Sequence, residues 1–288
     1  MSTNGLLRIE NPTPNDVDRC IAEHRPAIFS GVMHDQVATK SWDLPYLRDK
    51  LGARTVLVVK HDKPRIYWDP KGGLPLQPST FNEFADSAFV RKDPGYSYMQ
   101  DDVNSFPFIR DDYRLPAMME EKRIVRGKFW MSGRGLVTPL HYDAVETFHW
   151  VVRGAKRFLC YRPGVRNYYP FPWTTTAPFI SQLDPDQHDP ARYPRFKDAT
   201  PVDFELKAGE ILYLPAFWWH QVYSLAEINV SVNFVWWASL GKYVQHLPQL
   251  SRAGRHLWIQ YRKARAKALA AAKAEPRATP AARAARAA

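Results

Sequence analysis

Two histidines and one aspartate are the residues of this sequence whose types and spacing best suit metal chemistry. His141 and Asp143 lie two positions apart in the segment TPLHYD. Residues i and i+2 of a β-strand face the same side, so both side chains can point into one cavity. His220, at the end of the segment YLPAFWWH, is the best candidate for a third ligand. Two imidazoles and one carboxylate leave the opposite face of a metal ion open, as in non-haem Fe(II) oxygenases.

The ligand set alone leaves other interpretations open. Zinc and manganese also bind imidazole and carboxylate groups. The chain contains nine histidines, so an HxD pair with a distant histidine can arise by chance. The alternative is that His141 is a hydrogen-bonded barrel residue and that His220 is an ordinary core histidine.

Lys156 is the residue that favours a dicarboxylate ligand. It follows the Gly154 turn and begins a strand-like run, thirteen residues after Asp143. From this position it can reach the same cavity, where burying an ammonium group without an anionic partner would be costly. The alternative is a solvated lysine after a turn, which is where most lysines lie.

The pattern around these residues is that of a β-rich domain. Short strand-like runs separated by turn residues extend from about residue 129 to 237, at 136–143, 147–153, 156–161, 202–206, 210–214 and 229–236. Such regular short strands favour a sandwich or a jelly-roll barrel. The Pro- and Asp-rich segment 163–200 is too long for a structureless connector, so we interpret it as a functional insertion.

The flanking regions mix helices with further strands. Strand-like runs lie at 27–29 and 55–59, Asp43 and Gly52 bracket a predicted helix, and the segment 80–83 has the pattern of a capping box. Residues 240–261 have helical periodicity, and residues 262–288 form an Ala/Arg/Lys-rich tail, expected to be disordered or partly helical.

Charge and composition limit the classes of function. The net charge is +11, of which the tail 262–288 supplies +7 through eight Lys or Arg and one Glu, so the basic character says little about the cavity. The sequence has no pattern of a signal peptide and no apolar run long enough to span a membrane. Its two cysteines lie 140 residues apart, which favours a reducing compartment. We therefore expect a soluble cytoplasmic protein.

Several segments together resemble a known family. Residues 130–237 are similar to the JmjC/cupin-8 hydroxylases, most closely to the factor-inhibiting-HIF type of asparaginyl hydroxylase, in the segments TPLHYD, RGAKRFLCYRP, YPFP, SQLD, RYPRF, GEILYLPAFWWH and VNF. Weaker similarity reaches upstream through WDLPYLRDKLG, TFNEF and YMQ. The resemblance implies an all-β core, a double-stranded β-helix (jelly-roll or cupin) barrel with flanking N-terminal and C-terminal helices. We divide the chain into four regions. Residues 1–125 form an N-terminal helix/strand region packing on the barrel, and residues 126–239 form the JmjC/cupin barrel core. Residues 240–261 form C-terminal helices, and residues 262–288 form the tail.

The resemblance also implies an activity and a metal. His141, Asp143 and His220 match the iron(II) ligands of a 2-oxoglutarate-dependent dioxygenase. Such an enzyme uses O2 and 2-oxoglutarate, hydroxylates a C–H bond of an amino-acid, peptide or protein substrate, and releases succinate and CO2.

Roles in binding the co-substrate follow in the same way. The resemblance implies that Lys156 forms an ion pair with the distal carboxylate of 2-oxoglutarate, to which Thr138 and Tyr98 donate hydrogen bonds. Asn233 matches a residue near the iron-chelating end, and a buried amide of this kind needs partners. Thr147 stands where the relative has Asn, so that end of the co-substrate is expected to be held differently. The alternatives are a plain strand residue for Thr138 and a core aromatic for Tyr98.

A second departure concerns the substrate. The relative carries an Arg-Gln pair that grips its target asparagine, whereas this chain has Phe179 and Ile180 at those positions. Apolar side chains cannot make those hydrogen bonds, so asparaginyl hydroxylation is not carried over. We expect a substrate with an apolar group at this place.

Rival functions and partners remain open at this stage. A demethylase or a small-molecule oxidase would use the same centre, and a nonenzymatic cupin binding module would not need it. The resemblance implies a homodimer through the C-terminal helices, although their apolar face could equally pack on the chain's own barrel. Binding of nucleic acid through the tail is a weaker expectation, because the tail has no aromatic residues interleaved with its charges.

Overall fold

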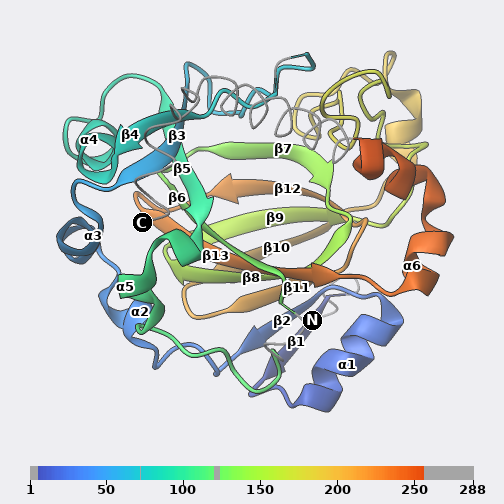
Figure 1. The fold of residues 1–288 in the computed structure, drawn as a ribbon. Helices are drawn as coiled ribbons and strands as arrows, with labels where there is room; N and C mark the ends of the chain where they lie inside the picture. The colour runs from blue at the N-terminus through green and yellow to red at the C-terminus, as the bar shows by residue number, and fades with distance from the viewer. Residues whose placement is uncertain (1–5, 72, 120–123, 256–288) are drawn as a thin grey trace, which may run out of the picture.

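Two β-sheets form the centre of the protein in the computed structural model, which describes residues 6–71, 73–119 and 124–255 (Figure 1). Within these ranges the larger sheet has the strand order β1-β2-β11-β8-β13-β6-β5-β3-β4. Its strands are β1 (Leu7–Glu10), β2 (Ala27–Ser30), β3 (Thr55–His61), β4 (Gln77–Thr80), β5 (Tyr96–Asp102), β6 (Arg126–Ser132), β8 (Val145–Arg153), β11 (Ile211–Leu214) and β13 (Asn229–Trp237). The smaller sheet has the order β10-β9-β12-β7 and contains β7 (Val137–Tyr142), β9 (Ala155–Tyr161), β10 (Val202–Lys207) and β12 (Trp219–Ser224).

The alternation of side chains along β8 shows how the two sheets form a barrel. Phe148 and Trp150 belong to a core cluster between the larger sheet and the N-terminal elements. Val151 points the other way and joins a cluster with Phe158 of the smaller sheet. The ring of His149 also contacts Phe158, with centroids 5.2 Å apart. Both faces of β8 are therefore buried, and its inner face lines the space between the sheets, which confirms the predicted jelly-roll fold.

The N-terminal strands extend the larger sheet on both sides of the barrel strands. β2 pairs with β11 in an antiparallel register, and β5 pairs with β6 in the same way. β3 and β4 continue the sheet beyond β5, and β1 lies at the opposite edge beside β2. Residues far apart in sequence thereby contribute to one continuous surface on the barrel's inner face.

The helices include α1 (Pro14–Glu23), α2 (Val37–Ser41), α3 (Leu44–Leu51), α4 (Phe81–Ala85), α5 (Pro107–Arg110) and α6 (Leu240–Gln245). Four of the described helices, α1, α3, α4 and α6, begin after a residue whose side chain accepts a hydrogen bond from an N–H group of the first turn. Asp43 caps α3 and Gly52 ends it, as predicted. Thr80 and Glu83 form the predicted capping box at α4, which runs on into a π-helical turn over Asp86–Val90.

The C-terminal helices lie beside α1 at one end of the barrel (Figure 1). α6 is tied to the barrel through Lys242, whose Nζ lies 2.9 Å from Oε1 of Glu146 at the start of β8. A further helical stretch covers 247–255. Four exposed apolar residues lie close together in sequence here: Trp237 at the end of β13, Leu240 and Val244 in α6, and Leu247 in the next helical stretch. The predicted tail 262–288 and the end of the 240–261 segment lie outside the described residues.

The long insertion between β9 and β10 sits at the same end of the barrel (Figure 1). It consists mainly of turns and bends, and its described residues include one short helical turn, the 3-10 turn Pro194–Asp198. The side-chain hydroxyl of Ser181 donates to the backbone of Tyr168 and accepts from that of Leu183. Internal hydrogen bonds of this kind replace regular secondary structure.

Two further expectations from the sequence concern the cysteines and membrane-spanning segments. Cys20 and Cys160 are both buried and free. Among the described residues, helices long and apolar enough to cross a membrane are absent.

Candidate metal centre

Three possible metal ligands converge at the end of the barrel that carries the insertion. His141, Asp143 and His220 each offer one ligand atom, and these atoms lie within 4.8 Å of one another. The two imidazole rings have centroids 4.1 Å apart, and Nε2 of His220 lies 3.9 Å from Oδ2 of Asp143. The side chain of His220 is 7% exposed and that of Asp143 is 47% exposed, so the group opens to solvent on the carboxylate side.

Neighbouring strands of the smaller sheet bring the two histidines together. His141 on β7 lies directly opposite His220 on β12. The register then shifts, because two β7 residues, Pro139 and Leu140, lie opposite Gln221 alone. Proline lacks an N–H group and is tolerated in a sheet at such a bulge. Asp143 follows the end of β7, where its carbonyl accepts a hydrogen bond from the N–H of Phe217.

Backbone carbonyls orient both imidazoles. Nδ1 of His141 lies 2.7 Å from the carbonyl oxygen of Pro139, and Nδ1 of His220 lies 3.0 Å from that of Trp218. Since a carbonyl only accepts, each Nδ1 carries the proton and each Nε2 keeps its lone pair for a metal. Burial, followed by the nearby imidazole of His141, lowers the pKa of His220 to about 3. The ring of His220 is therefore neutral, which is the form that binds metals.

A lysine lies deeper in the barrel than the candidate ligands. The side chain of Lys156 is buried, and its Nζ donates a hydrogen bond of 2.8 Å to the hydroxyl of Ser231 on β13. Burial lowers the pKa of Lys156 to about 7. Among the described residues Lys156 has no acidic partner within ion-pair distance. An anionic ligand in the barrel would supply the missing charge.

Two buried polar atoms near this lysine also have no hydrogen-bond partner among the described residues. They are Nε2 of His149 and Oδ1 of Asn233. These two residues lie opposite each other on β8 and β13 and so face the same side of the sheet. Buried polar groups are nearly always hydrogen-bonded. A polar ligand or a water molecule in the interior would supply the hydrogen bonds that these two atoms lack.

The other residues singled out in the sequence also line the inner face. Thr138 lies opposite Val222, a residue of the barrel-core cluster. Thr147 is buried on β8, two positions before His149. Tyr98 is buried on β5, and burial raises its pKa far above the usual value for a tyrosine. The barrel thus brings the strands of all the predicted site residues around one interior.

The β6 strand contributes interior residues that sequence reasoning missed. Lys128 lies opposite Asn233, and its Nζ lies 5.4 Å from the ring centroid of Trp130. Burial lowers the pKa of Lys128, while Asp143 and Asp102 raise it. The hydroxyl of Ser132, the next inward residue, lies 2.8 Å from that of Ser224. The only signal in the sequence was the i, i+2 spacing of Lys128, Trp130 and Ser132.

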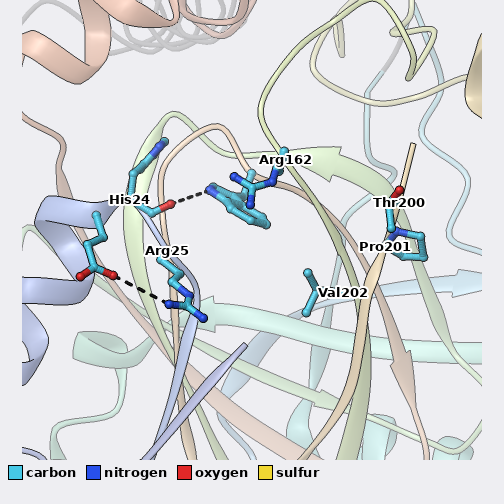
Figure 2. Close-up of a pocket in the computed structure, with 8 residues that line it drawn as sticks. His24, Arg25, Arg162, Thr200, Pro201 and Val202 are labelled. Atoms are coloured by element: carbon cyan, nitrogen blue, oxygen red, sulfur yellow. Dashed lines mark hydrogen bonds and ion pairs between the residues drawn. The ribbon is translucent and has the colours of Figure 1, made fainter. Parts of the chain in front are cut away.

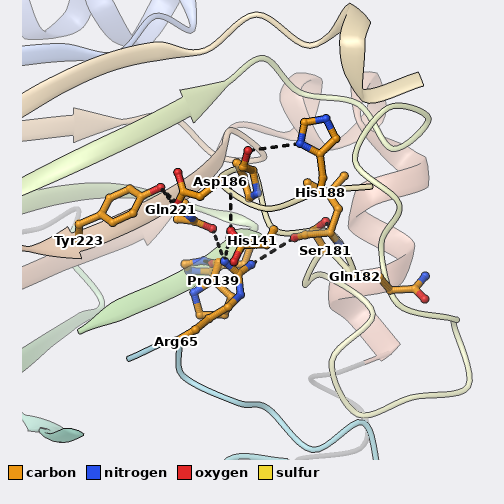
Figure 3. Close-up of polar contacts among 12 residues, drawn as sticks. Arg65, Pro139, His141, Ser181, Gln182, Asp186, His188, Gln221 and Tyr223 are labelled. Carbon is orange, nitrogen blue, oxygen red and sulfur yellow. Dashed lines mark hydrogen bonds and ion pairs between the residues drawn. The ribbon is translucent and has the colours of Figure 1, made fainter. Parts of the chain in front are cut away.

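A hydrogen-bonded network fixes the outer face of β12 directly after His220 (Figure 3). Gln221 is fully buried, accepts a hydrogen bond from Arg65 and donates to Asp186 and to the hydroxyl of Tyr223. Arg65 also forms an ion pair with Asp184 at 2.7 Å. The network joins the insertion and the β3–β4 connection to the strand that carries His220, so it positions that ligand.

The insertion also contacts the other histidine-bearing strand. Ile180 forms an antiparallel bridge with His141, and the carbonyl of Phe179 accepts a hydrogen bond from the N–H of Tyr142. The ring of Phe179 packs edge-on against Trp68, with centroids 5.8 Å apart. Ile180 is 4% exposed. The apolar pair noted in the sequence therefore lies beside the candidate metal centre.

Comparisons with known proteins agree with this geometry. The model of the cupin-like domain family matches residues 14–242. This chain is 26% identical to lysine-specific demethylase 8 of Xenopus tropicalis. The match covers 77% of this chain and 50% of that protein. The chain is 28% identical to the human bifunctional peptidase and (3S)-lysyl hydroxylase JMJD7, over 77% of this chain and 81% of the relative. It is 27% identical to the 2-oxoglutarate and iron-dependent oxygenase JMJD4 of Gallus gallus, over 80% of this chain and 59% of the relative.

Proposed function

The chain belongs to the cupin-like domain family, and from this premise we propose that it is an iron(II)- and 2-oxoglutarate-dependent oxygenase that hydroxylates a C–H bond of an amino-acid, peptide or protein substrate. The observation that carries the proposal is the convergence of two imidazoles and one carboxylate within 4.8 Å. A relative of similar sequence bears the name of a 2-oxoglutarate and iron-dependent oxygenase, and another that of a lysyl hydroxylase.

The donor set fits a ferrous ion. His141 and His220 would each bind it through Nε2, because their Nδ1 atoms are engaged by backbone carbonyls. Asp143 would supply the third donor and one negative charge. When bound, the ion would supply the chemistry that couples oxidation of a keto acid by O2 to hydroxylation of the substrate.

The interior fits the dicarboxylate 2-oxoglutarate. We assign Lys156 to its distal carboxylate, because this buried ammonium group has only the hydroxyl of Ser231 as a hydrogen-bond partner in the described chain. Thr138 and Tyr98 would donate to the same carboxylate. Asn233 and Thr147 would lie near the opposite end of the co-substrate. Neutral partners alone would leave the charge of Lys156 uncompensated, so a carboxylate fits better than an uncharged ligand.

The described residues also explain how water would be kept from the reacting groups. The aromatic and aliphatic side chains of Phe158, Val222 and Trp130 wall the interior. Asp143 is the most exposed of the three candidate ligands, with 47% of its side chain exposed. A substrate would therefore approach past Asp143 and exclude water as it binds.

Phe179 and Ile180 bear on the class of substrate. Because Ile180 bridges directly to His141, the residues at this place lie beside any group held near the metal. Their apolar side chains favour an apolar portion of the substrate over an amide. The closeness to the asparaginyl hydroxylase type inferred from the sequence stays a prediction, and hydroxylation of asparagine is not part of the proposal.

A demethylase is the second candidate function, because a relative bears the name of a lysine-specific demethylase. It would use the same centre and differ in the carbon that is hydroxylated. A nonenzymatic binding module would leave the convergence of His141, Asp143 and His220 and the buried Lys156 without a common purpose.

Production of succinate from 2-oxoglutarate tests the proposal. The purified full chain, supplied with Fe(II) and O2, is expected to release succinate even without a prime substrate, and His141→Ala is expected to abolish the release. His188→Ala is the matched control, since His188 lies in the insertion and outside the ligand group. Succinate production that persists in His141→Ala would refute the assignment, as would its complete absence in the native protein with all co-substrates present.

The expected homodimer also remains a proposal. Trp237, Leu240, Val244 and Leu247 offer an exposed apolar strip on and beside α6 that a second copy could cover. Light scattering of the native protein and of Val244→Glu would test it. Binding of nucleic acid by the tail and residence in the cytoplasm are proposals that rest on the sequence alone.

A further inference from the structure

Lys128 is a second lysine on the inner face of the barrel. Its neighbours on β6, Phe129 and Met131, point to the other face and belong to the core cluster between the larger sheet and the N-terminal elements. Ser132 points inward, and its hydroxyl reaches that of Ser224 on the smaller sheet. Because side chains alternate along a strand, Lys128 faces the same interior as Ser132.

Lys128 begins a polar row that crosses three neighbouring strands of the larger sheet. Asn233 lies directly opposite Lys128 on β13, and His149 lies opposite Asn233 on β8. Ser231, which accepts the hydrogen bond of Lys156, belongs to the next row on the same face. Two residues separate the rows along a strand, a distance of about 7 Å.

The polar row lies between the deep ammonium group of Lys156 and the candidate metal ligands. Burial, followed by the positive charge of Lys156 and then by His220, lowers the pKa of His149. Since electrostatic effects weaken with distance, His149 lies near both groups. Nε2 of His149 and Oδ1 of Asn233 are buried without a hydrogen-bond partner among the described residues. A ligand that extends from Lys156 to the metal side would pass over these two atoms.

The ammonium group of Lys128 has no carboxylate within ion-pair distance in the described part of the chain. It lies over the ring of Trp130, 5.4 Å from the centroid. Burial, followed by Arg126, lowers the pKa of Lys128, while Asp143 and Asp102 raise it. Asp102 is paired with Arg126 at 3.5 Å, and Asp143 is a candidate metal ligand. The charge of Lys128 is therefore available to an anionic ligand.

The cations on the outside of the barrel differ in this respect. A cavity of about 470 Å³ lies there, and Figure 2 shows Arg25 and Arg162 beside it. The carboxylate of Glu23 lines the same cavity and lies 4.0 Å from Arg25. An anion in that cavity would meet a resident carboxylate. In the interior, the charge of Asp143 would be engaged by the metal ion.

We propose that Lys128 binds the metal-side carboxylate of the co-substrate, so that each end of the dicarboxylate meets one ammonium group. Lys156 would bind the distal carboxylate, and Lys128 the carboxylate beside the metal ligands. The step of about 7 Å between the two rows is comparable to the length of an extended five-carbon dicarboxylate. The inference rests on the proposed function, because it takes 2-oxoglutarate as the occupant of the interior.

Calorimetric titration with 2-oxoglutarate of the full chain, loaded with Fe(II) in the absence of O2, tests the proposal without turnover. Lys128→Met and Lys128→Gln are each expected to weaken binding by about tenfold or more, as loss of a charge-assisted hydrogen bond implies. Lys60→Met is the matched control, because Lys60 lies on β3 of the same sheet and is exposed. It is expected to leave the affinity unchanged.

Titration with 2-oxopentanoate identifies the end that Lys128 binds. This keto acid keeps the metal-side carboxylate and lacks the distal one. Lys128→Met is therefore expected to weaken its binding by about tenfold or more, whereas Lys156→Met is expected to leave it nearly unchanged. A purely structural role of Lys128 would not produce this difference between the two variants.

The outcomes separate this inference from the proposed function. A native protein that does not bind 2-oxoglutarate overturns both. Binding that Lys156→Met weakens and Lys128→Met leaves unchanged overturns the assignment of Lys128 alone. An equal loss in Lys60→Met also overturns it, because it shows a general effect of charge, and so does a native protein that does not bind 2-oxopentanoate at millimolar concentration. Circular dichroism and Tm values establish that the variants are folded.

Discussion

Replacement of Lys156 by Met is expected to stabilise the ligand-free protein and to impair binding of 2-oxoglutarate. Met keeps an apolar side chain of similar length in the barrel but removes the buried ammonium group. Lys156 has a folded-state pKa of about 7, lowered by burial from 10.5. The folded protein therefore holds fewer protons than the unfolded chain between these two values.

The sign and size of the stability effect follow from proton linkage. Because the unfolded chain binds the additional proton, the stability of the native protein rises with pH from about 7 toward 10.5, and below pH 7 the full burial penalty applies. A shift of this size corresponds to a penalty of up to about 5 kcal/mol below pH 7 and to a rise of about 2 kcal/mol between pH 6.5 and pH 8.5. Lys156→Met has no titrating group at this position, so its unfolding free energy carries neither the burial penalty nor this rise with pH.

Urea unfolding of metal-free native protein and of Lys156→Met at pH 6.5 and pH 8.5 measures the effect. The difference in unfolding free energy between the two proteins is expected to shrink by about 2 kcal/mol at the higher pH. In parallel, loss of a charge-assisted contact is expected to weaken 2-oxoglutarate binding by about tenfold or more. A variant that is less stable than the native protein at pH 6.5, or one that binds 2-oxoglutarate equally well, would refute the reasoning.

Three further predictions concern the metal, a buried ion pair and the substrate. In Asp143→Ala the affinity for Fe(II) is expected to fall further than the drop of about 10–100-fold that follows loss of a residue bonded to a metal ligand. Its unfolding free energy is expected to change little, because the side chain is 47% exposed. Metal titration measures the first effect and urea unfolding the second. Glu146→Gln is expected to destabilise the fold by about 3–5 kcal/mol, because it leaves the Lys242 ammonium buried without a counter-charge, and urea unfolding should show much of this loss restored in the double variant with Lys242→Met. Phe179→Arg combined with Ile180→Gln is expected to shift turnover from apolar toward amide substrates, and unchanged selectivity in a succinate-release screen would contradict the apolar interpretation.

Much of the fold was predictable because its signals are local. Turn residues and alternating apolar positions marked six barrel strands to within a few residues, from β7 (Val137–Tyr142) to β13 (Asn229–Trp237). Asp43 and Thr80 marked helix starts because a capping side chain bonds the N–H groups of its own first turn. β12 was missed as a strand because its aromatic-rich segment lacks clear alternation.

The interior of the site was harder to foresee. Lys128 was missed because a lysine on a strand ordinarily faces solvent, and only its pairing with Asn233 shows that it faces the barrel. Glu146, three residues after Asp143, is 1% exposed and bonded to Lys242, 96 residues later in the chain. Both cases depend on partners that are distant in sequence, which no local pattern reveals.

The sequence by itself determined the kinds of ligand atoms, the i, i+2 spacing of His141 and Asp143, and the strand periodicity that sends both to one side. Only the tertiary structure decided that His220 lies opposite His141, that backbone carbonyls leave both Nε2 atoms available, and that Lys156 is buried against Ser231. The physical reason is that side-chain alternation is a property of one strand, whereas the register between strands depends on how the whole chain buries its apolar surface.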